Sequence, residues 1–215
     1  MTTTSSKERI VHIPDGDVRL EGSLGIPEGA PGVVLFAHGS GSSRHSPRNN
    51  FVARELQKAG LGTLLMDLLT REEDMDYDTR FDIALLARRL RAATAWLAVQ
   101  DDTKGLKIGY FGASTGSAAA LRASVPEGER IGAIVSRGGR PDLAMEALPD
   151  VKAPTLLIVG GLDDVVIGMN QKAYDALNAT KEMVIVPGAT HLFEEPGTLE
   201  EVAGHAVRWF KKHLQ

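Results

Sequence analysis

The segment Gly112-Ala113-Ser114-Thr115-Gly116 places a serine between two glycines, directly after a short apolar run. This G-x-S-x-G pattern is typical of a sharp turn between a strand and a helix, which exposes the serine hydroxyl at the end of the strand. Glycine suits both flanking positions because side chains there would collide with the backbone around the serine. A hydroxyl presented in this way can attack a carbonyl carbon. The pattern therefore predicts a nucleophilic serine at position 114.

A serine nucleophile needs a base that takes its proton and an acid that orients the base. Two later loops carry these residue types in a suitable order. Asp163 and Asp164 follow one apolar run, and His191 follows the last such run. Active sites of open α/β sheets lie at the carboxyl ends of the strands. The serine, an aspartate and the histidine are therefore expected to converge there, although they lie far apart in the sequence.

Apolar segments of strand length alternate with longer segments of helical period, which indicates a mostly parallel sheet with helices on both faces. The expected strands span residues 10–13, 18–26, 32–37, 61–67, 106–111, 131–136, 154–159 and 182–186. The expected helices span residues 47–59, 80–99, 117–124, 169–178 and 199–213. We expect one domain over residues 1–215, with residues 1–8 as a flexible tail. The acidic run at residues 72–78 is interpreted as a solvated loop.

With these residues in this order and setting, the chain resembles the α/β-hydrolase superfamily, and more narrowly its small dienelactone-hydrolase-like members. The resemblance extends from the first hairpin to the last helix, and it implies the α/β-hydrolase fold with an eight-stranded sheet. It also implies that Ser114 is the nucleophile, His191 the general base and Asp163 the orienting acid, with Asp164 as the alternative acid. The dienelactone hydrolases that name the group use a cysteine nucleophile, whereas this chain has no cysteine. The fold and the triad therefore transfer, but the lactone substrate does not.

The resemblance further implies an oxyanion hole formed by two backbone amides. One is the amide of Thr115, which follows the nucleophile. The other belongs to the loop after the third strand, where Ser40 is the preferred donor and Gly39 the alternative. His38 begins this loop. We expect it to line the substrate site chiefly as a structural part of the oxyanion loop.

Two arginines are candidate ligands of the substrate. Arg137 follows the sixth strand near the same sheet edge, and its planar guanidinium could clamp a carboxylate or a phosphate. Arg44 lies just beyond the oxyanion loop and could reinforce an anion-binding rim. The alternative for the arginines after the sixth strand is an internal ion pair, such as Arg140 with Asp142. The alternative for Arg44 is a solvated position before the next helix.

The segment between the sixth and seventh strands is short. Residues 137–153 leave room for a loop and a turn of helix, whereas large lipases of the superfamily insert a lid at this point. We therefore expect no lid domain and a shallow, open pocket. Such a pocket suits small or protruding esters.

Composition disfavours several other classes of protein. Acidic residues outnumber basic ones, 28 to 24, so nothing suggests binding to nucleic acid. The absence of cysteine excludes disulfides and thiolate metal sites. The N-terminus lacks the apolar core of a signal peptide, and no segment approaches the roughly 18 to 20 apolar residues of a membrane helix. We expect a cytoplasmic monomer or homodimer that needs no metal or organic cofactor.

The leading hypothesis is a serine hydrolase that cleaves small carboxylic esters through an acyl-enzyme. A thioesterase or a peptidase on the same triad is the nearest alternative, because one nucleophile can serve all of these reactions. The alternative from another class is a binding protein that keeps the fold without turnover. Such a protein would sense a small acidic ligand through Arg137.

Overall fold

The structure is a computed structural model, and it describes residues 8–215. In this range eight strands form one sheet in the order β1-β2-β4-β3-β5-β6-β7-β8. The strands are β1 (Arg9–Asp15), β2 (Val18–Gly25), β3 (Gly32–Ala37), β4 (Gly62–Met66), β5 (Lys107–Ala113), β6 (Ile131–Arg137), β7 (Thr155–Gly160) and β8 (Lys181–Val186). β2 pairs antiparallel with β1 and β4, and the other neighbours pair in parallel. The expected eight-stranded, mostly parallel α/β-hydrolase sheet is confirmed.

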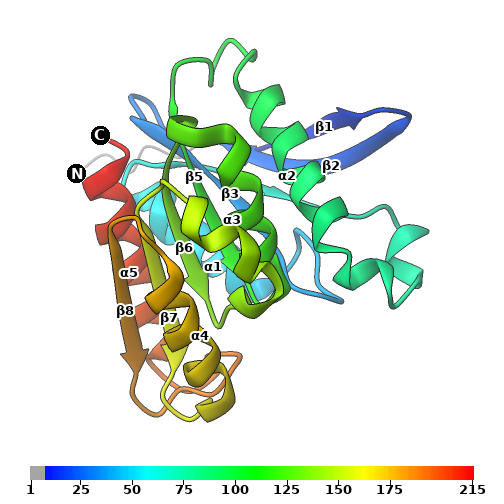
Figure 1. Ribbon diagram of the computed structural model, residues 1–215. Helices are drawn as coiled ribbons and strands as arrows, with labels where there is room; N and C mark the ends of the chain where they lie inside the picture. Colours follow the sequence, from blue (N-terminus) through cyan, green and yellow to red (C-terminus); the bar gives the residue numbers. More distant parts are fainter. Residues whose placement is uncertain (1–7) are drawn as a thin grey trace.

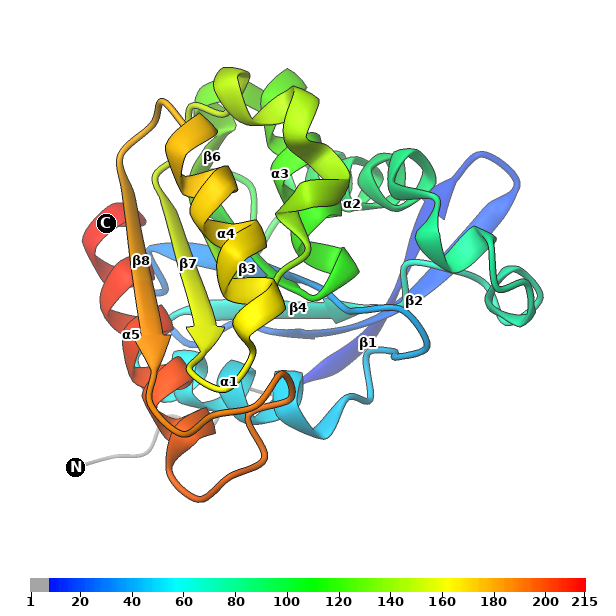
Figure 2. The same ribbon diagram turned by 60° about the horizontal axis from the view of Figure 1, so that its bottom comes forward.

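Helices cover both faces of this sheet (Figures 1 and 2). They are α1 (Pro47–Lys58), α2 (Ile83–Leu97), α3 (Thr115–Glu127), α4 (Asp164–Ala176) and α5 (Thr198–His213). α2, α3 and α4 lie on one side, and α1 and α5 lie on the other. Successive strand residues point to opposite faces. Tyr110 and Phe111 of β5 accordingly belong to the two separate hydrophobic cores, and both are completely buried.

The parallel strands all end at the same edge of the sheet. Figure 2 shows the arrowheads of β7 and β8 side by side at this edge. The loops that follow β3, β5, β6, β7 and β8 therefore meet at this edge, where α/β folds place their active sites. Between β6 and β7 the chain forms the 3-10 segment η4 (Pro141–Asp150), and no lid domain is present between Arg137 and Thr155.

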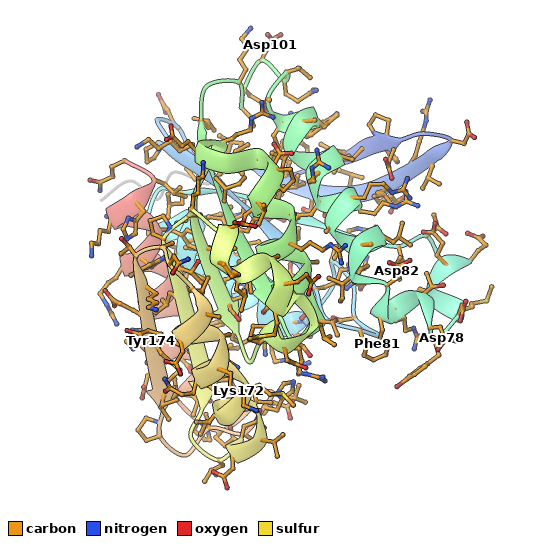
Figure 3. The ribbon with its side chains drawn as sticks, in the orientation of Figure 1. Asp78, Phe81, Asp82, Asp101, Lys172 and Tyr174 are labelled. Carbon is orange, nitrogen blue, oxygen red and sulfur yellow. The ribbon has the colours of Figure 1, made fainter. Side chains whose placement is uncertain are left out.

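Two helices begin three or more residues away from the starts that their sequence patterns indicated. α2 begins at Ile83 rather than at residue 80, because the Asp82 carboxylate caps it by accepting a hydrogen bond from the Leu85 amide at 2.9 Å. Figure 3 shows Asp82 and Phe81 at this end of α2. α4 begins at Asp164 rather than at residue 169. Its first turn exposes Val165 while the polar Asn170 is buried, which reverses the usual amphipathic pattern.

The acidic run is a loop, as expected, but its charges are not all solvated. It contains the 3-10 turns η1 (Glu73–Met75) and η2 (Thr79–Phe81). The Arg89 guanidinium, which is buried on α2, lies 2.6 Å from Glu73 and 3.3 Å from Asp15. This contact ties the loop to the first hairpin. Residues 1–7 of the expected N-terminal tail lie outside the described residues.

A membrane-spanning role finds no support in the helices. Within residues 8–215, none of them combines the length and the apolar content that a membrane span requires.

Candidate active site

Ser114 occupies a strained turn between β5 and α3. Its φ of 50° and ψ of −121° lie in a region that side chains rarely adopt. The Ser114 amide donates to the Arg137 carbonyl at 3.2 Å, and the Ser114 carbonyl accepts from the Arg140 amide at 3.1 Å. These bonds hold the strained backbone in place. Strain of about 1 to 3 kcal/mol per residue persists mainly where function uses it, so the turn is a candidate nucleophile elbow.

The glycines of the elbow are required by close backbone contacts. A Cβ atom added at Gly116 would lie 2.1 Å from the Ala37 carbonyl oxygen, and one added at Gly112 would lie 2.5 Å from the Ser117 Cα. Gly39 lies opposite, where an added Cβ would be 3.1 Å from the Ser114 Cβ. The elbow therefore packs tightly against β3, the loop after β3 and the start of α3.

Gly116→Ala is expected to destabilise the fold by about 3 kcal/mol or more, because the new methyl group meets backbone atoms that cannot rotate away. Gly168→Ala in α4 is the matched control, since nothing lies within 4 Å of the added Cβ. It should be neutral or stabilise the protein by up to about 1 kcal/mol. Urea denaturation of both variants measures the difference. Equal stability of the two would contradict the crowding at the elbow.

The predicted acid and base are in direct contact. His191 Nδ1 lies 2.7 Å from Asp163 Oδ2, within hydrogen-bond distance. A carboxylate that accepts from Nδ1–H leaves Nε2 free to accept a proton, which is the tautomer that a general base needs. The Leu162 amide donates to the Ala189 carbonyl at 2.9 Å, which joins the two loops that carry this pair. Asp164 is exposed in the first turn of α4.

The end of β6 brings the histidine loop to the nucleophile elbow. The Arg137 carbonyl binds the Ser114 amide, and the next residue, Gly138, adopts a φ of 51°. A Cβ added at Gly138 would lie 3.1 Å from the His191 carbonyl oxygen and 3.6 Å from its ring Cε1. Ser114, Asp163 and His191 therefore belong to loops that meet at one strand end.

The predicted oxyanion residues are also close together. Thr115 is the first residue of α3, so its amide has no acceptor within the helix. The Ser40 amide donates to Thr115 Oγ1 at 2.8 Å, which fastens the oxyanion loop to the elbow. To bind an oxyanion, the Ser40 amide would have to share or exchange this bond. Gly39 faces Ser114 directly, as described above.

His38 lies beneath the oxyanion loop and is buried. Its Nε2 accepts from the Leu68 amide at 3.0 Å, and Nδ1 lies 3.0 Å from the Gly39 carbonyl oxygen, to which it can donate. Both ring nitrogens therefore form hydrogen bonds with backbone groups. Burial lowers the pKa of His38 below its ordinary value of 6.5, because the charged imidazolium loses hydration there.

This lowered pKa predicts a loss of stability in acid. Between the folded and unfolded pKa values of His38 the unfolded chain binds more protons, so the free energy of unfolding falls as the pH drops below about 6.5. The slope from one proton is at most about 1.4 kcal/mol per pH unit. His38→Gln removes this titration and should give a flatter pH dependence. Urea denaturation between pH 7 and pH 4 measures it, and identical slopes would contradict the prediction.

The arginines near the site have different surroundings. Arg44 pairs with Asp67 and Glu21 in the wall of a cleft of about 630 Å³ beside the oxyanion loop. Arg140 forms a two-bond ion pair with Asp142, both bonds at 2.8 Å, which confirms the internal pair considered from the sequence. Arg137 is 6% exposed. Its guanidinium lies 5.8 Å from the ring centroid of Phe193.

Phe193 is a residue of this site to which sequence reasoning assigned no role. It has a φ of 57° and, with Ser114, is one of two non-glycine residues of positive φ among residues 8–215. Its amide donates to the Thr190 carbonyl at 3.2 Å, closing a turn that contains His191. No sequence pattern marks a phenylalanine for such a conformation.

Comparison with known proteins identifies the relatives of this chain. The sequence pattern of the dienelactone hydrolase family matches residues 20–214. The chain belongs to the dienelactone hydrolase family. A dienelactone hydrolase from Anabaena variabilis ATCC 29413 is 59% identical with a TM-score of 0.95, over 98% of this chain and 99% of that one. An esterase domain from a Rhodothermus marinus protein has a TM-score of 0.78 at 18% identity, over 97% and 100% of the two chains, and shows the fold alone.

A curated relative in Mycobacterium tuberculosis strain H37Rv is named a putative phosphoribosyl transferase. It is 55% identical over 208 residues, which are 97% of this chain and 47% of that protein. The chain thus spans about half the length of this relative. The family match and the Anabaena structure each cover most of this chain.

Proposed function

We propose that this chain is a serine hydrolase that cleaves small carboxylic esters through an acyl-enzyme. The observation that carries the proposal is the hydrogen bond between His191 and Asp163 at the strand end where Ser114 occupies its strained elbow. A serine hydroxyl is a weak nucleophile without a base, so the pairing supplies what the chemistry needs. The phosphoribosyl transferase name does not transfer, because this chain spans only 47% of that relative and has a hydrolase fold.

In the proposed reaction, His191 takes the proton of Ser114 Oγ as the oxygen attacks the ester carbonyl. Asp163 stabilises the resulting imidazolium and keeps the ring oriented. The Thr115 amide and one amide of the oxyanion loop, Ser40 or Gly39, stabilise the negative oxygen of the tetrahedral intermediate. His191 then protonates the leaving alcohol, so that the acyl group remains on Ser114.

Deacylation repeats these steps with water. His191 takes a proton from water as its oxygen attacks the acyl carbon, and the tetrahedral intermediate collapses to release the carboxylic acid. The proton returns to Ser114 Oγ. Water is therefore the second reactant, and His191 carries out each proton transfer.

A set of acyl donors that share one acyl group tests the reaction class. An ester, a thioester and an amide with the same butyryl group are compared by their kcat/KM values. The proposal expects the ester to be the best substrate. A preference for the thioester or amide would replace the ester assignment, and no turnover of any donor would favour a binding protein with this fold.

A further inference from the structure

Among the described residues, Arg137 is a buried positive charge without a negative partner. It ends β6, and by strand alternation its side chain lies on the same face as Val135, in the layer of α1 and α5. Within residues 8–215 its guanidinium makes no hydrogen bond or ion pair. The charge that acts on it most is another cation, Arg48 of α1. Burial lowers the pKa of Arg137 to about 10, so the group stays protonated at neutral pH.

An unpaired buried cation destabilises a fold, because lost hydration is not replaced. The contact that compensates in part is the Phe193 ring, 5.8 Å from the guanidinium carbon. The attraction between a cation and an aromatic face is stronger when both groups are desolvated. Phe193 is 1% exposed and Arg137 is 6% exposed, so both groups are largely desolvated.

Phe193 needs such a contact because its backbone is strained. A non-glycine residue at a φ of 57° persists only where its surroundings hold it. The turn closed by its amide contains His191, two residues earlier. A Cβ added at Gly138 would lie 3.5 Å from the Phe193 ring and 3.1 Å from the His191 carbonyl oxygen. Movement of the Phe193 ring would therefore move the backbone that carries His191.

The main chain of Arg137 contacts the other half of the site. Its carbonyl oxygen accepts from the Ser114 amide at 3.2 Å. One residue thus contacts the nucleophile elbow through its backbone and the histidine loop through its side chain. We propose that Arg137 is a positioning residue, whose guanidinium over Phe193 keeps the turn of His191 in register with Ser114. The inference rests on the proposed function, since it assigns a role within that triad.

A positioning role and an anchoring role predict different kinetics. Anchoring of an anionic substrate is the role that the sequence suggested for Arg137. An anchor must be reached by the substrate, and the 6% exposure of Arg137 leaves little of its surface for a substrate carboxylate to contact. Loss of an anchor would raise KM for a carboxylate-bearing ester and spare a neutral one. Loss of a positioning residue would lower kcat for both esters equally and leave KM unchanged.

The test compares wild type with Arg137→Met on two esters with the same leaving group, one acyl chain neutral and one ending in a carboxylate. The expected result is a fall of about 10- to 100-fold in kcat for both, the range for small misplacements of a catalytic group. The melting temperature should be unchanged or higher, because the buried unpaired charge is gone. Arg137→Lys keeps a cation over the ring and should have a kcat closer to that of wild type.

Two further variants keep the test decisive if Arg137→Met folds poorly. Phe193→Leu removes the ring but keeps an apolar side chain, and it should lower kcat in the same way. Combined with Arg137→Met it should add little, because both changes break one contact. Arg122→Met is the matched control: this arginine is partly exposed on α3, pairs with Glu146 and should leave kcat unchanged.

Three results would overturn the inference: an unchanged kcat of Arg137→Met, a change confined to the KM for the carboxylate ester, or, where Arg137→Met melts at a lower temperature than wild type, an unchanged kcat of Phe193→Leu. In each of these the wild type still turns over ester and is labelled on Ser114 by a fluorophosphonate. A wild type that does neither would instead overturn the proposed function, and this inference with it. The two failures are therefore distinguishable.

Discussion

Ser114→Ala should lower the kcat for ester hydrolysis by a factor on the order of 10⁶ and abolish labelling by a fluorophosphonate. The loss is this large because the alanine side chain has no oxygen that can attack the carbonyl carbon. Alanine keeps the Cβ that packs against Gly39, so the elbow and the fold should survive. Intact-mass measurement after labelling gives the result directly, with one adduct on wild type and none on the variant.

Ser124→Ala is the matched control for this experiment. Ser124 also lies on α3, but its buried hydroxyl donates to the Leu121 carbonyl at 2.7 Å and faces the core. The control should keep one fluorophosphonate adduct and nearly all of its turnover. An adduct on Ser114→Ala would show that another residue is the nucleophile.

Asp163→Asn should lower kcat by about 10⁴-fold, the second largest effect expected here. Asp163 Oδ2 lies 2.7 Å from His191 Nδ1, so the carboxylate selects the tautomer whose Nε2 can accept a proton. An asparagine amide facing Nδ1 favours the opposite tautomer, in which Nε2 carries the hydrogen. The variant should therefore fold normally and bind ester, yet acylate slowly. Stopped-flow measurement of the acylation burst tests this step.

Asp164→Asn separates the two adjacent aspartates. Asp164 lies in the first turn of α4, where a negative charge contributes about 0.3 to 1 kcal/mol to stability through the helix dipole. Its loss should change the melting temperature slightly and kcat by no more than about twofold. A larger fall in kcat for Asp164→Asn than for Asp163→Asn would reverse the assignment of the acid.

Most of the fold could be predicted from the sequence because its signals are local. Each strand is a short apolar run bounded by turn residues, and all eight positions agree with the structure. Helix limits were less predictable. Asn170 is buried on α4 with its amide donating to the Gly139 carbonyl, and Val165 faces solvent, so the amphipathic period misplaced the start of that helix. Such reversals depend on contacts with distant segments.

The sequence by itself determined the family, the sheet, and the order in which a serine, an aspartate and a histidine reach the strand ends. These features reside in short motifs and in apolar periodicity. Only the tertiary structure decided which partners the polar groups take. It placed the Ser40 amide on Thr115 Oγ1, and it buried Arg137 over Phe193. Residues more than fifty positions apart make these contacts. Their geometry depends on how the strand ends pack together, which no local pattern encodes.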